Sequence, residues 1–187
     1  MTFNNSKAAG VLLFIGCIEF ILGMTIAETL YPEYSVSLNY ISDLGVGTTA
    51  LLFNSSVFLL GLLVLVGAYF IQRAFDYKIL SICLALTGIG AMGVGLFPET
   101  AGTIHGIVSL ITFLFGALSA VVSYKLQKTL FSCFAVLLGI MSFVALGLFI
   151  SGNYLGLGKG GMERMIVYPT LLWGVGFGSH LMNREES

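Results

Sequence analysis

Six long apolar stretches constrain most strongly what this chain can fold into. They cover residues 8–27, 50–71, 79–97, 103–123, 130–150 and 165–182. A helix needs about 20 predominantly apolar residues to cross the hydrocarbon core of a bilayer, and each stretch is close to that length. Helices also satisfy their own backbone polar groups, which lipid cannot do. The sequence therefore predicts an all-α, polytopic membrane bundle of six transmembrane helices, built as one integral membrane domain over residues 1–187.

The composition supports a membrane protein and excludes several other classes. Hydrophobic residues make up 57% of the chain and charged residues only 9%, whereas soluble domains carry about 25% charged residues. An ordinary soluble enzyme, a disordered chain and a secreted disulfide scaffold are therefore excluded. The net charge is −1 and no dense basic patch is present, so nucleic acid is not an expected partner. Membrane lipids are the expected partners.

The distribution of Lys and Arg predicts the orientation of the chain. Positively charged residues collect on the cytoplasmic side of membrane proteins. With the N-terminus inside, six of the eight Lys and Arg residues lie at cytoplasmic ends of the spans, namely Lys7, Arg73, Lys78, Lys125, Lys128 and Arg184. The outer connections hold only Lys159 and Arg164. We therefore expect a multi-pass protein of the cell membrane with both termini in the cytoplasm.

The first outer connection, residues 28–45, contains polar residues at helical spacing. Ser35, Asn39 and Asp43 recur every four residues with apolar residues between them. This pattern predicts a short amphipathic helix. It lies at the interface, with Tyr31 in the aromatic belt, or it directs Asn39 and Asp43 into a polar pocket at the outer face.

A histidine and a serine begin the fourth predicted span. His105 and Ser109 are four residues apart and so share one helix face, and Glu99 precedes them by a few residues. A histidine in this position can act as a general base, oriented by Asp43 or Glu99, with Ser109 or water as the nucleophile. The alternative is a structural hydrogen bond between helices.

Charged residues also stand before the sixth span and within the first. Arg164 and Tyr168 are four residues apart. A charge at the membrane edge needs a partner, so Arg164 forms an ion pair with Asp43, Glu28 or Glu99, or it binds an anionic ligand. Glu19 lies halfway along the first span, where a carboxyl group is either a structural hydrogen-bonding group or an intramembrane acid that carries protons.

Small residues and cysteines are assigned to packing. Gly174 and Gly178, and likewise Gly88, Ala91 and Gly95, form stripes that allow helices to approach closely. The stripes pack the bundle internally, which we favour, or form a homodimer. The three cysteines lie in separate spans without a paired motif and are expected to be small core residues.

Three groups of residues, in order on six spans, resemble one membrane family. They are Tyr31-Pro-x-Tyr-Ser with Asn39-x-x-Ser-Asp-Leu-Gly45, then Phe97-Pro-Glu with His105, and finally Glu163-Arg with Tyr168-Pro169. The family is the archaeal and bacterial one catalogued as domain of unknown function nine-nine-eight, and the resemblance covers essentially the whole chain. It implies a six-helix membrane protein without an established activity.

The predicted site favours binding over catalysis. An outer pocket would hold a lipid headgroup or small polar ligand, with Tyr31, Asn39, Asp43, His105, Ser109, Arg164 and Tyr168 as ligand-binding residues. One alternative is a membrane hydrolase or lipid-remodelling enzyme with His105, Asp43 and Glu99 as catalytic residues. Another is a small proton-coupled transporter that uses Glu19. No cofactor is predicted, and no metal either, because the two histidines lie on opposite sides of the predicted membrane.

Overall fold

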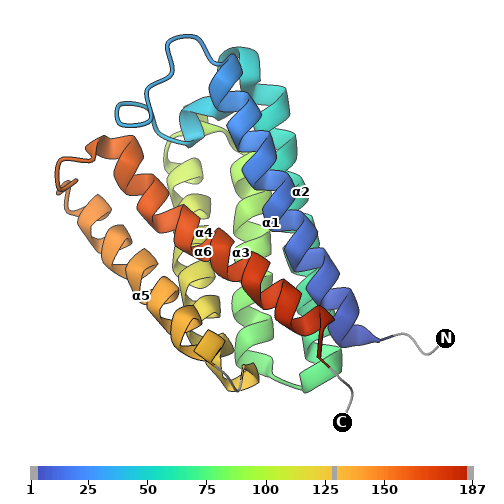
Figure 1. The fold of residues 1–187 in the computed structure, drawn as a ribbon. Helices are drawn as coiled ribbons and strands as arrows, with labels where there is room; N and C mark the ends of the chain where they lie inside the picture. The colour runs from blue at the N-terminus through green and yellow to red at the C-terminus, as the bar shows by residue number, and fades with distance from the viewer. Residues whose placement is uncertain (1–3, 128–129, 185–187) are drawn as a thin grey trace.

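A computed structural model describes residues 4–127 and 130–184 of the chain (Figure 1). These residues form six long α-helices, and three of the connections between them contain short 3₁₀ helices, four in all among the described residues. The α-helices are α1 (Asn5–Leu30), α2 (Ala50–Phe75), α3 (Lys78–Leu96), α4 (Thr103–Val122), α5 (Leu130–Ile150) and α6 (Gly158–Met182). The all-α bundle expected from the sequence is therefore confirmed, and each helix covers one of the six predicted stretches.

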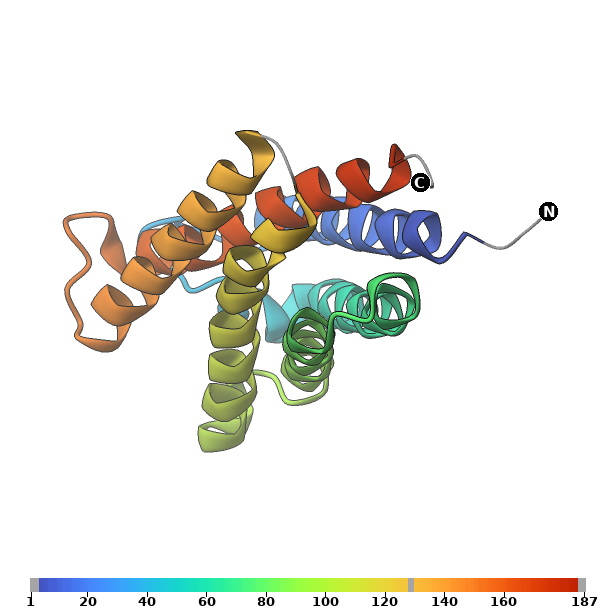
Figure 2. The ribbon, with the colours of Figure 1, turned by 90° about the horizontal axis from the view of Figure 1, so that it is seen from below.

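The six helices form a closed ring. Each helix packs against its neighbours in the sequence, and α6 closes the ring by packing along α1 as well as α5. Figure 2 shows this arrangement from below, with the two ends of the chain on the same side. The buried apolar side chains, among them Leu13, Leu84 and Phe177, point into the ring.

The outside of the ring is apolar, as a protein surrounded by lipid requires. Leu22, Val66 and Ile89 are more than one-third exposed, and every α-helix carries such residues. Five helices, α1 to α5, are long and apolar enough to cross a membrane. Helix α6 is 25 residues long, but it begins seven residues before the predicted span and includes Lys159, Glu163 and Arg164. A sixth crossing stays a prediction.

Close glycine contacts explain how the helices approach each other. A Cβ atom on Gly10 of α1 would lie 2.6 Å from the Gly178 carbonyl oxygen of α6, and one on Gly88 of α3 would lie 2.6 Å from the Gly61 carbonyl oxygen of α2. Such distances are too short for any side chain. Both predicted small-residue stripes therefore pack helices inside the bundle, which was the favoured alternative. A homodimer stays a separate prediction.

The two ends of the bundle differ. The N-terminal part of α1 and the C-terminal part of α6 meet at one end, where the Ser6 hydroxyl donates to the Leu181 carbonyl at 3.2 Å. The opposite end, called the loop end below, holds residues 31–49, 97–102 and 151–157 (Figure 1). It corresponds to the predicted outer face. Lys128, one of the residues behind that orientation, lies outside the described residues.

The prediction of an amphipathic helix in the first outer connection is wrong. Residues 31–41 form turns, followed by two short 3₁₀ helices, η1 (Ser42–Gly45) and η2 (Gly47–Thr49). The polar side chains that suggested a helix bond to the backbone instead: Asn39 Oδ1 accepts from the Ser35 N–H, and Asp43 Oδ2 accepts from the Tyr40 N–H. Such local bonds compete with helical ones and favour turns.

Candidate functional site

Arg164 fastens the first connection to α6. Its Nη2 donates to Glu28 Oε1 at 2.5 Å and to the Tyr34 hydroxyl at 2.6 Å, and its Nη1 donates to the carbonyls of Val36 at 3.2 Å and Gly160 at 3.0 Å. The guanidinium is well suited to this role because its donors are arranged in a rigid fork. We call this group of contacts the Arg164 lock. Of the predicted alternatives for Arg164, the structure contains the ion pair, and its partner is Glu28.

The Arg164 lock is buried and tightly packed. Arg164 is only 4% exposed. Burial raises the pKa of Tyr34 to about 12 despite the nearby guanidinium, so its hydroxyl keeps its proton and donates it to the Tyr40 carbonyl. The Gly160 N–H donates to the Ser37 carbonyl, and a Cβ atom at Gly160 would collide with the Asn39 carbonyl oxygen. The position therefore requires glycine.

Asp43 and Glu99 form a carboxyl pair that joins the first connection to the α3–α4 connection. The two groups are hydrogen bonded to each other, which requires one of them to hold a proton. Burial, and then the hydrogen bond and charge of Asp43, raise the pKa of Glu99 to about 7. Burial also acts on Asp43, but hydrogen bonds from Glu99, Asn39 and the Tyr40 N–H outweigh it and lower the pKa of Asp43. The shared proton therefore belongs to Glu99.

Side-chain contacts hold this connection together. Asn39 Nδ2 donates to Asp43 Oδ2 at 3.0 Å. Tyr31 packs edge-on against the Tyr34 ring, with 5.6 Å between ring centroids. Lys159, at the start of α6, lies over the Tyr40 ring at 4.1 Å from its centroid. These contacts add to the attachment of the connection to the bundle.

His105 and Ser109 are also in contact, but not with the carboxyl pair. His105 Nδ1 lies 2.8 Å from the Phe97 carbonyl oxygen, and Nε2 lies 3.2 Å from Ser109 Oγ. A carbonyl only accepts, so Nδ1 carries a proton, and the tautomer that is protonated at Nδ1 alone leaves Nε2 to accept from the Ser109 hydroxyl. No hydrogen bond joins His105 to Asp43 or Glu99 among the described residues; a backbone carbonyl takes the orienting position instead.

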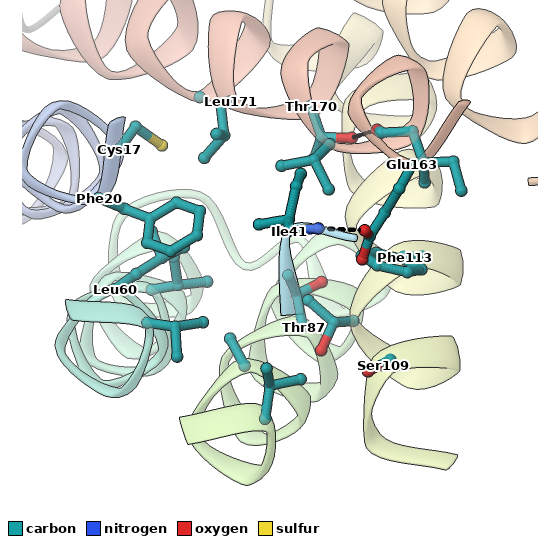
Figure 3. A pocket seen from close by; sticks show the side chains of 18 of the residues that line it. Cys17, Phe20, Ile41, Leu60, Thr87, Ser109, Phe113, Glu163, Thr170 and Leu171 are labelled. Atoms are coloured by element: carbon teal, nitrogen blue, oxygen red, sulfur yellow. Dashed lines mark hydrogen bonds between the residues drawn. The ribbon is translucent and has the colours of Figure 1, made fainter. Parts of the chain in front are cut away.

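An internal cavity of about 100 Å³ lies inside the ring of helices. Apolar side chains of α1, α2, α3, α4 and α6 form most of its wall, and it runs from the loop end to the deeply placed Trp173. Figure 3 shows Ile41 and Glu163 meeting at the cavity, with Phe113 and Ser109 on one side and Phe20 and Leu60 on the other. Six of the residues that line the cavity have a hydroxyl or carboxyl group: Ser42, Thr87, Ser109, Thr112, Glu163 and Thr170.

Glu163 is the charged residue of this wall, and sequence reasoning did not select it. Its Oε2 accepts from the Ile41 N–H at 2.5 Å, and the side chain is 6% exposed. The contact spans 122 residues of sequence. Two signals pointed to it: its position beside Arg164 just before an apolar stretch, and its place in the Glu163-Arg group of the family resemblance. Cavity and carboxylate together make the loop end a candidate binding site.

Of the predicted ligand-binding residues, only Ser109 is among the described residues that line this cavity, and Tyr168 and Glu19 have other surroundings. Tyr168 is 38% exposed and does not belong to the cavity wall. Glu19 Oε1 accepts from the Ser56 hydroxyl of α2 at 2.6 Å, whereas its buried Oε2 lacks a partner among the described residues. Glu19 does not line the cavity either. A proton-carrying role for Glu19 stays a prediction, and the observed bond to Ser56 matches the structural alternative.

Comparisons with known proteins give one match. A family model described as protein of unknown function (DUF998) matches residues 14–180. Neither the curated proteins nor the solved structures include a match to this chain. Among the described residues, no group of three or more His, Cys, Asp or Glu is placed to hold a metal ion.

Proposed function

Because the chain belongs to the DUF998 family of proteins of unknown function, its activity must be argued from its site, and we propose that it binds a lipid. The apolar part of the ligand would occupy the internal cavity, and its polar head would lie at the loop end. The observation that carries this proposal is the cavity itself: an apolar wall contributed by five helices, with a buried carboxylate and several hydroxyl groups on it.

The physical basis is the cost of an unfilled apolar space. Side chains around a void lose dispersion contacts, and a ligand that fills the space restores them. Dry apolar cavities in proteins bind apolar molecules of matching size for this reason. In a membrane protein the natural source of such a molecule is the surrounding lipid. Ser42 and Glu163, which line the cavity at the loop end, would then face the polar part of the same molecule.

A pair of matched variants tests this proposal. Val57 lines the cavity and is 5% exposed, whereas Val66 on the same helix is 37% exposed and does not line it. We expect Val57→Phe to fill part of the cavity and to displace the ligand, and Val66→Phe to leave it in place. Native mass spectrometry of protein released gently from its own membranes would report a discrete added mass for wild type and Val66→Phe, and a reduced or absent one for Val57→Phe.

The same measurement can reject the proposal. A bare protein mass in all three samples would mean that no lipid is held tightly. An added mass retained in equal amount by Val57→Phe would mean that the lipid binds on the outside of the bundle and not in the cavity.

A second candidate function is hydrolysis of a lipid ester, which the contact between Ser109 and His105 favours. Ser109 lines the cavity, and the unprotonated Nε2 of His105 is placed to take a proton from its hydroxyl. The attacking oxygen would be that of Ser109 or of a water molecule. We expect His105→Ala to abolish hydrolysis of a fluorogenic lipid ester without lowering the melting temperature. Equal hydrolysis by the variant would exclude His105 as the general base.

A further inference from the structure

The polar groups on the cavity wall are hydrogen-bond acceptors. The Thr87 hydroxyl donates to the Cys83 carbonyl and the Thr112 hydroxyl to the Val108 carbonyl, each at 2.8 Å within its own helix. The Ser109 proton is directed to His105. Each hydroxyl therefore uses its single proton on the protein and presents only lone pairs to the cavity.

Glu163 adds the strongest acceptor. One of its oxygens, Oε2, accepts from the Ile41 N–H, and the other, Oε1, has no hydrogen-bond partner among the described residues. The side chain is more than nine-tenths buried and lines the cavity. Oε1 is not among the fully enclosed unpartnered atoms of the described residues, so it is open to the cavity that the side chain lines, and a ligand that supplies a donor gives it a hydrogen bond there.

The cations of the loop end are already engaged. Arg164 makes four hydrogen bonds within the Arg164 lock, and neither it nor Lys159 lines the cavity. Lys159 lies over Tyr40, and its charge acts on Asp43 and Glu99. Burial raises the pKa of Glu163 to about 7, so its carboxyl group is mostly ionised only above that pH. A phosphate or carboxylate head would therefore find acceptors in the cavity and, above pH 7, a negative charge, while no cation of the described residues lines the cavity to offset them.

The head group should also decide which molecule is selected. Lipid tails are as apolar as the cavity wall, so moving an acyl chain from the bilayer into the protein yields little hydrophobic free energy. Selectivity must then come from the polar end of the ligand. This reasoning rests on the proposed lipid-binding function and specifies its ligand.

We propose that the cavity takes a single-chain amphiphile whose head donates hydrogen bonds and carries no negative charge, that is, an amine or an alcohol, with Glu163 Oε1 as its acceptor. This excludes the anionic ligand that Arg164 alone would suggest. Arg164 holds the loop, and Glu163 receives the ligand.

The single tryptophan of the chain provides a direct test. Trp173 is 5% exposed and lines the deep part of the cavity, so a chain that enters the cavity brings its far end close to the indole. Three amphiphiles of equal chain length, each brominated near the end of the chain, would be titrated onto the protein: an alkylamine, an alkanol and an alkanoate. At about pH 8 the amine is cationic and the alkanoate anionic. Bromine quenches tryptophan fluorescence on contact.

We expect the amine or the alkanol to quench Trp173 at a concentration at least tenfold lower than the alkanoate requires. Val57→Phe should abolish quenching, because it blocks the cavity. In Glu163→Gln the amide oxygen can accept from Ile41 while its NH₂ group faces the ligand, so the preference should disappear or reverse toward the alkanoate. Glu33→Gln is the control, since Glu33 is exposed at the same end and lies outside the cavity wall.

The outcomes separate this inference from the proposed function. If no amphiphile quenches Trp173, lipid binding in the cavity fails and the inference fails with it. If the alkanoate quenches as well as the amine and the alkanol, the cavity binds lipid but the stated head group is wrong. If Glu163→Gln folds and keeps the wild-type preference, Glu163 is not the acceptor. The comparison of the three amphiphiles on wild type stands even if that variant does not fold.

Discussion

Glu163 and Arg164 are neighbours in the sequence and lie in the same turn of α6, yet their surroundings differ. Both side chains are more than nine-tenths buried. Arg164 makes four hydrogen bonds to protein groups, including an ion pair to Glu28, and only its Nε lacks a partner among the described residues. Glu163 makes one hydrogen bond and lines the cavity. Successive residues on a helix point about 100° apart, which is enough to place one in the Arg164 lock and the other in the cavity wall.

This difference shows how a charged residue that holds the fold of a membrane protein can be told apart from one that binds a ligand. Both residues are costly to place near lipid, so charge alone marks both as important. Two observations distinguish them: Arg164 makes four hydrogen bonds to protein groups and does not line the cavity, whereas Glu163 makes one and does line it. We take the first pattern to mark a charge that holds the fold together, and the second to mark one that leaves a position for a ligand. The predictions below test this division, beginning with the largest expected effect.

Arg164→Ala should have the largest effect on stability. The change removes four hydrogen bonds and leaves Glu28, whose side chain is 19% exposed, without its ion-pair partner. Removing one member of a buried pair costs about 3–5 kcal/mol, and we expect a loss of that size in the free energy of unfolding. Thermal unfolding in detergent is the measurement. An unchanged melting temperature would show that the Arg164 lock does not hold the fold.

Gly160→Ala should disrupt the same lock without changing any charge. A Cβ atom at Gly160 would lie within 2.5 Å of the Val36 carbonyl oxygen and closer still to that of Asn39, so the first connection must move away from α6. We expect a loss of about 1–3 kcal/mol, as is usual for overpacked sites.

Gly161→Ala serves as the matched control. A Cβ atom there meets only the Leu157 side chain, at 3.0 Å. Alanine is also the better helix former, so this variant should match wild type in thermal unfolding or exceed it slightly. Equal losses in the two alanine variants would mean that close contact at Gly160 is not what matters.

Lowering the pH from 7 toward 4.5 should increase the free energy of unfolding through protonation of Glu99. Its pKa is raised from 4.5 to about 7 in the folded protein, so the folded state holds more protons than the unfolded chain between these values. The free energy of unfolding should therefore fall as the pH rises through this range. The lowered pKa of Asp43 acts in the opposite direction at lower pH, where protonation of Asp43 removes stability.

The expected size of the Glu99 effect is about 1 kcal/mol or less, because Glu99 is partly exposed and solvent screens it. In Glu99→Gln the amide keeps a donor for Asp43 but cannot titrate. Melting temperatures of this variant should change less between pH 5 and pH 7 than those of wild type. A pH dependence as steep as that of wild type would assign the titration to another group.

Glu163→Gln should have the smallest effect on stability. The amide oxygen can still accept from the Ile41 N–H, and only the charge on that hydrogen bond is lost. We expect a change of about 1 kcal/mol or less in the free energy of unfolding. A loss as large as that of Arg164→Ala would place Glu163 among the groups that hold the fold, and the contrast between the two neighbours would disappear.

Local spacing predicted part of this structure, and tertiary contacts determined the rest. The helices follow from the lengths of the apolar stretches, and the contact between His105 and Ser109 follows from their four-residue spacing on one helix. The ion pair of Arg164 was restricted to three candidate carboxylates, and the structure selects Glu28.

The remaining contacts depend on how separate connections fold together. The bond from Ile41 to Glu163 joins residues 122 positions apart, and no periodic pattern specifies it. The same holds for the Asp43–Glu99 pair, which joins two connections at the loop end. The predicted amphipathic helix failed for a related reason: its spacing was helical, but its side chains bond to the backbone nearby.

The most direct test of the divided roles compares Arg164→Lys and Glu163→Gln with wild type in thermal unfolding, with and without a long-chain alkylamine. Lysine keeps the charge beside Glu28 but not the fork of donors. We predict that Arg164→Lys melts at a lower temperature than wild type but is stabilised by the amine to the same extent. Glu163→Gln should melt close to wild type and gain no stability from the amine. Loss of the amine effect in Arg164→Lys, or its persistence in a folded Glu163→Gln protein, would contradict the account.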